Sequence, residues 1–524
     1  MASKVRTRPS VRAPVYGGRF MAVTGHAAST MAAIDIHKRG GNVIDCAIAA
    51  SSTMAAAVSQ ATSIGGDCFL LYHEAATGKI HALNASGVAP AAATPEVFKD
   101  GMKSVGPLAA VVPGLVRAWE QLHKRFGTLK LSELLDNSIA IAEGHPVSHV
   151  MGERLAEDTT KLAADPGCAG VYMPGGRAVR LGETLHQPAL AKTLRRIADQ
   201  GADEFYLGET ARNIAAAHKI AGGLMTTADL AQYAPMWVEA VSTDYRGHQV
   251  VVQPPNTCSA YLLMQLDGLS ALTTSELTGD PVRRMAYQMS AMKASFAAGA
   301  EFVCDPALMP DGAQKMLSPE MKARMQAAVR AMDAKGRVPS SGGTACILIA
   351  DAKGNMVVIV QSIYNVFGSM FMDPASGVLF NNRMQDFKPQ AGLAGSVGPG
   401  RRPFHTLCPI MVMKDGRPRY ILASPGGISQ TLTGAQLLTE LIDCGSDVAA
   451  AVEAPRWCNR ASGEFLIENF FPASMPDDLA KLGHKATRGG DSYYYGSAKA
   501  IEWLASGNLA GAGDHRREAF VAGV

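Results

Sequence analysis

Thr344 is the residue whose type and position in this sequence could do nucleophilic chemistry. It follows Gly342 and Gly343 and opens the apolar run TACILIAD. Small residues before a threonine allow its hydroxyl to attack the preceding backbone carbonyl, which would break the chain after Gly343. Thr344 would then carry both a hydroxyl nucleophile and an α-amine able to act as its base. The plainer interpretation is a threonine that only opens a strand, so the rest of the sequence has to decide.

The segments around Thr344 predict how it is positioned. A Gly/Ser/Pro-rich stretch at 336–343 marks an internal boundary, and residues 344–364 predict a β-hairpin around the turn 351–355. An Ala-rich helix is expected at 40–59 and another β-hairpin at 67–84. Further expected elements are a mainly helical middle at 113–332 and strands at 377–381, 409–414 and 420–423.

Composition excludes several classes of protein. Hydrophobic residues make up 47% of the 524 residues and charged residues 18%, which is ample for a large folded core. The formal net charge of +3 gives no electrostatic footprint for nucleic acid. No apolar run reaches the roughly 20 residues of a transmembrane helix. We therefore expect a small-molecule substrate and neither a nucleic-acid nor a membrane partner.

The cysteines and the start of the chain indicate a compartment. Nine cysteines are scattered without a CxxC pair or a zinc-ligand spacing, which is typical of free thiols under reducing conditions. The basic first segment is interrupted by prolines and has no continuous apolar stretch of a secretory signal. We expect a cytoplasmic protein whose chemistry needs no metal and no organic cofactor.

A series of motifs occurs in one order along nearly the whole chain. They are GGNVIDCAIAA, SIGGDCFLLYH, VPGLVRAWEQLHKRFGTLKLSELL, GGLMTTADLAQYAP, TACILIADAKGN, FGS, LFNNRMQDF and SPGG. In these motifs the chain resembles the γ-glutamyltranspeptidase family of N-terminal-nucleophile hydrolases. The resemblance implies an α+β fold, a four-layer αββα sandwich. It also implies cleavage between Gly343 and Thr344 into a large, helix-rich fragment 1–343 and a small fragment 344–524, which stay together as one intertwined unit.

The same resemblance implies the catalytic residues. Thr344 aligns with the nucleophile, and Ser362 with a second hydroxyl residue that hydrogen-bonds it. Gly426 and Gly427 align with the pair whose backbone N–H groups form an oxyanion hole. The plainer interpretations are a polar residue near a strand end for Ser362 and an ordinary turn for the two glycines.

The motif FNNRMQDF is implied to surround the substrate. It contains Asn381, Asn382 and Asp386, and Asp386 aligns with the carboxylate that holds a glutamyl α-amino group. Asp386 could instead order its loop through backbone N–H groups. The following stretch, between Asp386 and Arg401, is shorter than the covering loop of lidded relatives, which predicts a more open or differently closed site.

Recognition positions depart from the family pattern. The glutamyl enzymes carry an arginine that grips the substrate α-carboxylate, and this chain has Ser86 followed by Gly87 there. A hydroxyl cannot replace a planar, bidentate cation. The other exchanged positions are His405 and Thr406 in place of paired serines, Arg383 in place of a glutamine, and Tyr364 in place of an asparagine.

These exchanges predict the same reaction on a different acyl group. We hypothesise that Arg383 or His405 supplies a relocated anchor for an acidic substrate, as in the oxamate amidohydrolase and acylase branches of the family; Arg383 could equally be a surface residue paired with Asp386. The expected function is a self-processing threonine amidohydrolase that hydrolyses a small non-glutamyl amide through an acyl-enzyme, with a carboxylate-bearing, oxamate-like substrate as one option.

Three other functions stay open at this point. The first is a genuine γ-glutamyl hydrolase or transferase acting on glutathione-like substrates. The second is a glutaryl- or cephalosporin-type acylase, and the third is a non-processing, inactive binding homologue. In the active cases we expect a heterodimer of the two fragments, with a dimer of these heterodimers as a further option.

Overall fold

Two β-sheets stacked face to face form the centre of the structure. The computed structural model describes residues 12–332, 343–460, 462–490 and 492–524. Within these residues the first sheet has the strand order β21 (Phe520–Gly523), β2 (Phe20–Thr24), β10 (Gly343–Asp351), β11 (Met356–Tyr364), β3 (Asp67–Glu74), β4 (Lys79–Ala85) and β7 (Met236–Val238). The second has the order β1 (Val15–Gly17), β20 (Leu509–Gly513), β19 (Lys499–Trp503), β15 (Arg417–Ala423), β14 (Ile410–Lys414), β9 (His248–Val252) and β8 (Val241–Tyr245).

Each sheet combines strands from before and after Thr344. In the first sheet β10 lies between β2 and β11, and both pairings are antiparallel. In the second sheet β14 pairs with β9 and with β15, again antiparallel. The parts of the chain on either side of Thr344 are therefore joined by backbone hydrogen bonds throughout the core.

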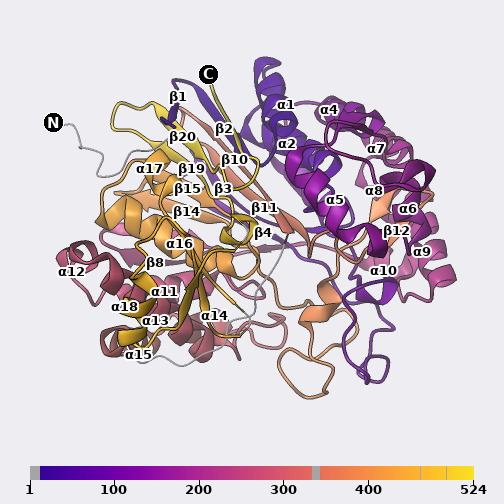
Figure 1. The fold of residues 1–524 in the computed structure, drawn as a ribbon. Helices are drawn as coiled ribbons and strands as arrows, with labels where there is room; N and C mark the ends of the chain where they lie inside the picture. The colour runs from indigo at the N-terminus through magenta and orange to yellow at the C-terminus, as the bar shows by residue number, and fades with distance from the viewer. Residues whose placement is uncertain (1–11, 333–342, 461, 491) are drawn as a thin grey trace.

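Helices cover the outer face of each sheet (Figure 1). Beside and beyond the first sheet lie α1 (Ala27–Lys38), α2 (Val43–Ala57), α3 (Leu115–Phe126), α4 (Leu131–Glu143), α5 (His149–Leu162), α6 (Pro166–Tyr172), α7 (Pro188–Gln200), α8 (Ala202–Leu207), α9 (Glu209–Ala221) and α10 (Thr227–Gln232). On the side of the second sheet lie α11 (Ala260–Leu269), α12 (Thr274–Gly279), α13 (Pro281–Gly299), α14 (Gly312–Met316), α15 (Pro319–Ala331), α16 (Ser429–Leu438), α17 (Val448–Glu453) and α18 (Met475–Lys481).

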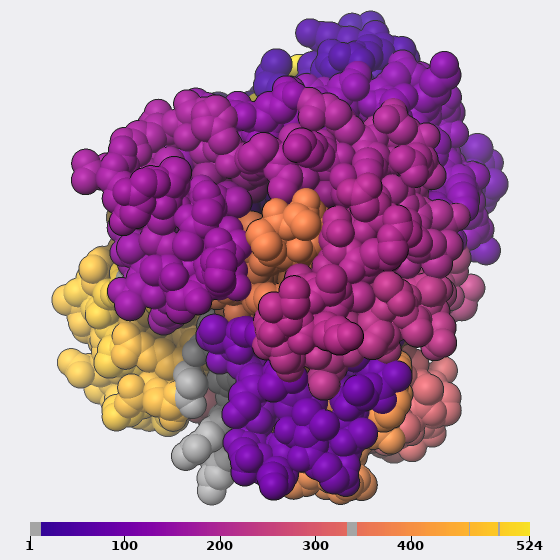
Figure 2. All heavy atoms as spheres, turned by 90° about the vertical axis from the view of Figure 1, so that its right-hand side faces the viewer, coloured from indigo at the N-terminus to yellow at the C-terminus, as the bar shows by residue number. Residues whose placement is uncertain are grey.

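Small sheets complete the described chain. They are β5 (His145–Pro146) with β6 (Thr184–Leu185), β12 (Met372–Asp373) with β13 (Val378–Leu379), and β16 (Trp457–Asn459) with β17 (Phe465–Ile467) and β18 (Ala486–Arg488). The face made mainly by the helical segments before residue 240 is shown in Figure 2, where orange atoms from the chain after Thr344 lie in a hollow between purple and magenta segments.

The alternation of side chains along β10 separates two hydrophobic layers. Ile347 and Ile349 pack with α1, α2 and α3, whereas Cys346 and Leu348 pack between the sheets with residues such as Ile501 of β19. A third layer, including Leu262 and Leu422, lies between the second sheet and its helices. Successive side chains of a strand point to opposite faces, so one strand can contribute to both layers. The result is a four-layer αββα sandwich.

Helix α2 shows how the sequence permits this packing. Its N-cap residue Asn42 accepts hydrogen bonds from the N–H groups of Ile44 and Asp45, and the Asp45 side chain accepts from the Asn42 N–H in return. Every residue of α2 is buried, and most are alanine, serine or other small residues. Small side chains let neighbouring helices and the sheet approach closely, which is why this Ala-rich segment occupies the core.

Most elements expected from the sequence are present. The helix at 40–59 corresponds to α2, the hairpin at 67–84 to β3 and β4, and the hairpin at 344–364 to β10 and β11. The middle of the chain is mainly helical, although β7, β8 and β9 also arise there and join the sheets. The stretch 336–342 lies outside the described residues. Among the described helices, none is both long enough and apolar enough to cross a membrane.

Candidate active site

Thr344 lies at the start of β10, with its hydroxyl next to the carbonyl that precedes it. The peptide bond between Gly343 and Thr344 is intact within the strand. The Thr344 Oγ1 donates to the Gly343 oxygen at 2.7 Å, and the Ser362 Oγ donates to the same oxygen at 2.6 Å. Two hydroxyls on one carbonyl oxygen polarise the C=O bond, and one of them is the expected nucleophile.

The surrounding strands fix this geometry. Gly343 pairs with Tyr364 and Ala345 with Gln361, so β11 contains an extra residue at this point and the register shifts there. A Cβ on Gly343 would lie 3.1 Å from the Gln60 carbonyl oxygen, so a larger residue would need a small shift of the neighbouring backbone. The position is therefore tightly packed.

The N-terminus of α16 approaches Thr344 from the second sheet. The Gln430 Nε2 lies 3.4 Å from the Thr344 Oγ1, while the Gln430 Oε1 accepts from the Cys408 N–H at 2.9 Å. The Oε1 of Gln430 is thus fixed by the Cys408 N–H, and its Nε2 directs an N–H at the Thr344 hydroxyl. Sequence analysis did not single out Gln430, although it lies three residues after the SPGG motif.

Gly426 and Gly427 form the turn that precedes α16. Both have positive φ, 137° and 56°, a backbone region that favours glycine. Their carbonyl oxygens accept from the N–H groups of Ser429 and Gln430, but within the described chain neither glycine N–H donates to a protein acceptor. Two unpaired N–H groups before a helix can bind a developing oxyanion, so the geometry is compatible with the expected role.

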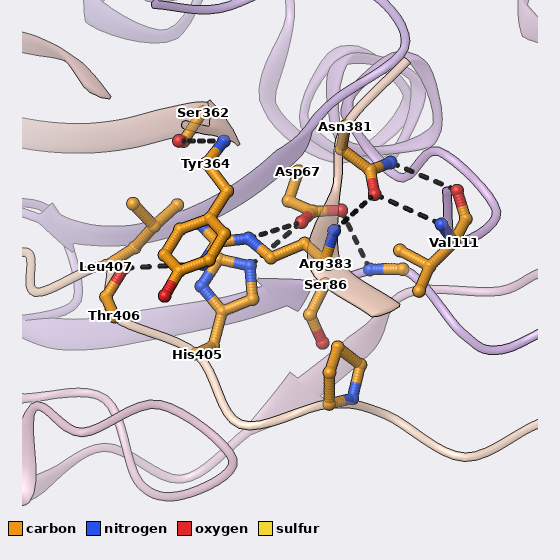
Figure 3. Close-up of polar contacts among 12 residues, drawn as sticks. Asp67, Ser86, Val111, Ser362, Tyr364, Asn381, Arg383, His405, Thr406 and Leu407 are labelled. Atoms are coloured by element: carbon orange, nitrogen blue, oxygen red, sulfur yellow. Dashed lines mark hydrogen bonds and ion pairs between the residues drawn. The ribbon is translucent and has the colours of Figure 1, made fainter. Parts of the chain in front are cut away.

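A buried ionic network lies directly beside this centre (Figure 3). Its central acid is Asp67 of β3, which pairs in register with Ser362 of β11. The Asp67 carboxylate accepts from Arg383 Nε at 3.2 Å, from His405 Nε2 at 2.9 Å and from the Gly87 N–H at 3.0 Å. Asp67, Arg383 and His405 are all 0% exposed. Sequence analysis missed Asp67, although it lies in the quoted motif SIGGDCF.

Asp386 is engaged by the same network. The Arg383 Nη1 lies 3.5 Å from its carboxylate and 3.3 Å from the Thr406 Oγ1. The Arg383 guanidinium also stacks on the ring of Tyr364, with 4.2 Å between Cζ and the ring centroid. Burial raises the pKa of Asp386 to about 6, opposed by the positive charge of Arg383 and a hydrogen bond from Tyr364. Asp386 is therefore bound by the protein's own cation and phenol.

Tyr364 and His405 are constrained by this cluster. Tyr364 has a φ of 79°, which residues other than glycine rarely adopt. Its N–H donates to the Ser362 Oγ at 2.7 Å. Burial lowers the pKa of His405 to about 4, with the nearby Arg383 acting in the same direction and Asp67 opposing. His405 is therefore neutral at physiological pH, so it adds no positive charge to the site.

Ser86 is held away from the nucleophile. Its hydroxyl donates to the Asn84 side chain at 2.7 Å, and its carbonyl oxygen accepts from Arg402 and from the Tyr233 hydroxyl. Ser86 is 0% exposed. It forms part of a structural network and presents no group to a substrate in this arrangement.

The two asparagines of the FNNRMQDF motif have different roles. Asn381 is buried and ties the backbone of Val111 to that of Gly65 through its side-chain amide. Asn382 accepts from the Asn365 N–H at 3.1 Å and donates to the Ser104 carbonyl at 2.9 Å. Of the two, Asn382 lines the large cavity described next.

Two cavities lie near Thr344 and the glycine turn. A hole of about 40 Å³ is lined by Thr344 and Pro425, and a cavity of about 830 Å³ is lined by Gly426, Asn365 and Asn382. A still larger cavity, of about 1010 Å³, lies against α5 and the C-terminal segment, and neither Thr344 nor Gly426 lines it. The 830 Å³ cavity is therefore the better candidate for substrate, since it reaches the glycine turn.

The 830 Å³ cavity carries an excess of positive charge. Its charged lining residues are Arg154, Lys161, Arg460, Arg517, Glu157 and Asp158. The two carboxylates are each paired, Glu157 with Arg154 at 2.7 Å and Asp158 with Lys161 at 2.7 Å. Arg383 and His405, the anchors hypothesised from sequence, do not line this cavity and are buried in the network around Asp67.

The structure thus divides the residues expected from sequence into two groups. Thr344, Ser362 and Gly426 lie around the Gly343–Thr344 peptide bond and the cavities beside it. Arg383, Asp386, His405, Thr406 and Tyr364 form the adjacent buried network, joined to the first group through Ser362. The expectation that Arg383 could be a surface residue is wrong, because Arg383 is 0% exposed.

The αββα architecture is that of the N-terminal-nucleophile amidohydrolases and acyltransferases. Comparison with known structures agrees: a cephalosporin acylase from Bacillus halodurans superposes with a TM-score of 0.90 at 31% identity, covering 100% of this chain and 99% of that one. The family model for gamma-glutamyltranspeptidase matches residues 29–524. The chain therefore belongs to the gamma-glutamyltranspeptidase family.

Curated relatives of this chain fall into more than one branch of the family. An Acylase ACY 1 proenzyme from Pseudomonas sp. (strain SE83) is 31% identical, over 95% of this chain and 92% of its own length. A glutathione hydrolase-like YwrD proenzyme from Bacillus subtilis (strain 168) is 30% identical, over 97% of this chain and 99% of its own. Both relatives are described as proenzymes.

Proposed function

We propose that this protein is a self-processing threonine amidohydrolase that hydrolyses the amide bond of a small, non-glutamyl acyl compound. The observation that carries the proposal is the contact of the Thr344 hydroxyl with the Gly343 carbonyl, 2.7 Å between oxygens, beside a second hydroxyl from Ser362. The hydrolase and proenzyme character of the relatives supports it. The cleavage site, the roles of individual residues and the acyl group are parts of the proposal.

Maturation would proceed by an acyl shift. The Thr344 Oγ attacks the Gly343 carbonyl carbon, the C–N bond breaks, and the Thr344 nitrogen takes up the proton, leaving an ester. That shift frees the Thr344 α-amine, and water then cleaves the ester to release the Gly343 carboxylate and restore the Thr344 hydroxyl. The two fragments, 1–343 and 344–524, would remain associated as a heterodimer because both sheets contain strands from each.

Turnover would reuse the same hydroxyl. The Thr344 Oγ attacks the substrate amide carbon while the α-amine accepts its proton and passes it to the leaving amine. The N–H groups of Gly426 and Gly427 would stabilise the tetrahedral oxyanion. Water completes the cycle by hydrolysing the acyl-enzyme, and the α-amine accepts and returns the proton in that step as well.

The network around Asp386 supports a non-glutamyl substrate. A carboxylate that is to hold a substrate ammonium must be open to it, but Asp386 is occupied by Arg383 and Tyr364. Ser86 is buried and carries no charge to meet a substrate carboxylate. If the substrate does bear a carboxylate, as in an oxamate-like or ω-carboxyacyl amide, the unbalanced cations of the 830 Å³ cavity are better placed to meet it than Arg383 or His405.

A γ-glutamyl hydrolase or transferase is the second candidate function. It is favoured by the match to the gamma-glutamyltranspeptidase family over residues 29–524 and by the glutathione hydrolase-like relative. It would require that the substrate displace Arg383 from Asp386. Turnover of glutathione or of γ-glutamyl anilide at rates above those of simple acyl anilides would establish it.

A denaturing gel tests the proposal first. The 55.0 kDa chain, divided in proportion to length, gives fragments of about 36 and 19 kDa. N-terminal sequencing of the smaller fragment should begin at Thr344, and Thr344→Ala should stay whole. A panel of small amides and N-acyl amino acids, with Thr344→Ala as the blank, then identifies the acyl group. Wild-type protein that remains one chain, or Thr344→Ala that keeps full activity, contradicts the proposal.

A further inference from the structure

The small hole beside Thr344 is lined by more positively than negatively charged side chains. Its charged lining residues are Lys499, Arg517 and Glu518. The side chains that reach it from the α2 region, including Met54 and Gln60, are uncharged. The hole of about 40 Å³ is large enough for roughly one water-sized group. Cleavage at Thr344 would therefore create an α-amine next to two cations and one carboxylate.

Lys499 faces Thr344 across the gap between the sheets. It begins β19, and Ile501, two residues further along, points into the layer between the sheets. Cys346, two residues after Thr344, points into the same layer from β10. Residues two apart in a strand share a face, so the side chains of Lys499 and Thr344 both point into this layer, and both line the hole.

Lys499 is buried without a carboxylate partner. It is 1% exposed, and its Nζ donates to the Ser497 carbonyl at 3.0 Å and to the Ser497 hydroxyl at 3.2 Å. Within the described part of the chain no acidic group lies within ion-pair distance of it. Burying a lysine without a counter-charge is costly, and a methionine or glutamine would fill the same volume more cheaply. This cost suggests a function for the charge.

Glu518 offsets one of the two cations around the hole, so one positive charge is left in excess. Arg517 donates to the Tyr493 carbonyl at 3.0 Å and stacks on the Tyr493 ring, 3.5 Å from the centroid. Glu518 accepts from the Val150 N–H at 3.2 Å. A further carboxylate that acts on Lys499, Asp514, is bound by Arg456 and Arg516.

We propose that Lys499, together with Arg517, lowers the pKa of the α-amine that cleavage creates on Thr344, so that this amine is a neutral base near pH 7. The inference depends on the proposed function, because an uncleaved chain has no such amine. Lys499 acts through Thr344 and is in this sense a positioning residue. This role of Lys499 does not depend on which acyl group the enzyme accepts.

General physical chemistry gives the expected size. A free α-amine has a pKa of about 7.7–8.0, so only about a tenth to a sixth of it is neutral at pH 7. Burial and nearby like charges both disfavour the protonated form, and here they act in the same direction. Arg517 stays protonated at any pH of the experiment, so part of the effect remains when Lys499 is replaced.

The experiment measures the α-amine directly. Mature wild-type protein, Lys499→Met and Lys499→Gln are labelled competitively with acetic anhydride across pH 5–10, and acetylation of the small fragment's N-terminus is quantified by mass spectrometry. We expect a wild-type pKa below 7 and an increase of about one unit in both variants. The acidic limb of the kcat/KM profile should move by the same amount, with activity at pH 9 within about twofold of wild type.

Lys293 provides the matched control. It is a partly buried lysine of α13 that packs near Phe465, away from Thr344. Burial lowers the pKa of Lys293, as it does that of Lys499, so the two lysines are matched in this respect. Lys293→Met should leave the labelling curve and the pH profile unchanged. A similar change in Lys293→Met would show that loss of any lysine charge perturbs the amine, which overturns the specific role of Lys499.

Other outcomes also overturn the inference. A wild-type α-amine pKa of 7.7 or more does so without any variant, so the test survives if Lys499→Met does not fold. An unchanged pKa in the variants, or a loss of activity that is equal at all pH values, leaves Lys499 with a structural role only. A wild-type chain that stays whole on the gel removes the proposed function itself, and this is seen before any titration.

Discussion

The hydroxyl of Ser362 donates to the carbonyl oxygen of Gly343 at 2.6 Å, from the neighbouring strand β11. This contact places a hydrogen-bond donor where negative charge would develop during attack by Thr344. It also connects the Gly343–Thr344 peptide bond to the buried network, because Ser362 pairs in register with Asp67. The proposed catalytic centre and the network therefore meet on neighbouring strands of one sheet.

Replacing Ser362 should slow self-cleavage. Ser362→Ala removes one of the two hydroxyl donors to the Gly343 oxygen, and a hydrogen bond that strengthens in the transition state is worth about 1.5 kcal/mol, or roughly tenfold in rate. Ser362→Thr should keep most of the rate. A gel time course after expression measures the effect, with Ser138→Ala as a control, since that buried hydroxyl binds a remote helical carbonyl. Cleavage of Ser362→Ala at the wild-type rate would remove Ser362 from maturation.

Gln430 should matter to turnover although no motif drew attention to it. In Gln430→Met the contact with the Thr344 Oγ1 is lost and the buried Cys408 N–H loses its acceptor. We expect kcat to fall several-fold and the free energy of unfolding to fall by about 1–3 kcal/mol, because an unsatisfied buried N–H is costly. Steady-state kinetics and guanidinium unfolding measure the two effects. Gln265→Met, in buried helix α11, is the control; equal loss of kcat there would point to general disruption.

Arg383 should prove structural rather than substrate-binding. Arg383→Met leaves Asp67 and Asp386 without their buried cation, and breaking such a pair typically lowers stability by about 3–5 kcal/mol. KM for a carboxylate-bearing amide should stay within about twofold, because Arg383 does not line the 830 Å³ cavity. A large rise in KM with unchanged stability would reinstate Arg383 as the acid anchor.

Arg460 tests the positive cavity. If the acyl group carries a carboxylate, Arg460→Met should raise KM for ω-carboxyacyl anilides by about tenfold, in line with loss of a charge-assisted contact of about 1.4 kcal/mol. KM for an uncharged acyl anilide of equal length should not change. Arg324→Met, on the remote helix α15, is the control. Identical KM values for charged and uncharged anilides in wild type would show that the cavity does not select an acid.

Asp386 and His405 should give opposite pH dependences of stability. The pKa of Asp386 is raised to about 6, so the folded chain holds this proton between pH 4 and 6 when the unfolded chain has lost it, and stability falls as pH rises through that range. The pKa of His405 is lowered to about 4, so the unfolded chain takes up the proton first on acidification, and stability rises with pH between 4 and 6.5. In wild type the two largely cancel.

Single substitutions should separate the contributions of Asp386 and His405 to the pH dependence of stability. In Asp386→Asn only the titration of His405 still makes stability depend on pH. The free energy of unfolding should therefore drop more steeply than in wild type as the pH falls from 6 to 4. His405→Gln should do the reverse. Each difference is at most about 3 kcal/mol across the range, since one pKa unit is about 1.4 kcal/mol. Urea unfolding at several pH values, with Asp100→Asn as an exposed control, measures them. Parallel pH curves for all variants would mean that neither group titrates as described.

The sequence alone determined the central elements and the reacting residue types. The Ala-rich segment around α2 and the apolar runs around the Asp351–Asn355 turn have periodicities and turn residues that depend on local chain physics, so helix and hairpin could be predicted from them. Thr344 after Gly-Gly could be recognised because its proposed chemistry is encoded in adjacent residues. The ordered motifs then placed the chain in its family, which the comparisons confirm.

Only the tertiary structure decided what surrounds Thr344. Gln430, Asp67 and Lys499 come from elements that lie far from Thr344 in the sequence, the nearest being Gln430 at a separation of 86 residues. No local sequence pattern encodes such contacts. Arg383 looked available for substrate in the sequence, but its burial against Asp67 depends on the packing of β3 beside β11. The net charge around the hole beside Thr344 is the sum of charged groups from several segments of the chain. These groups come together only when the chain has folded.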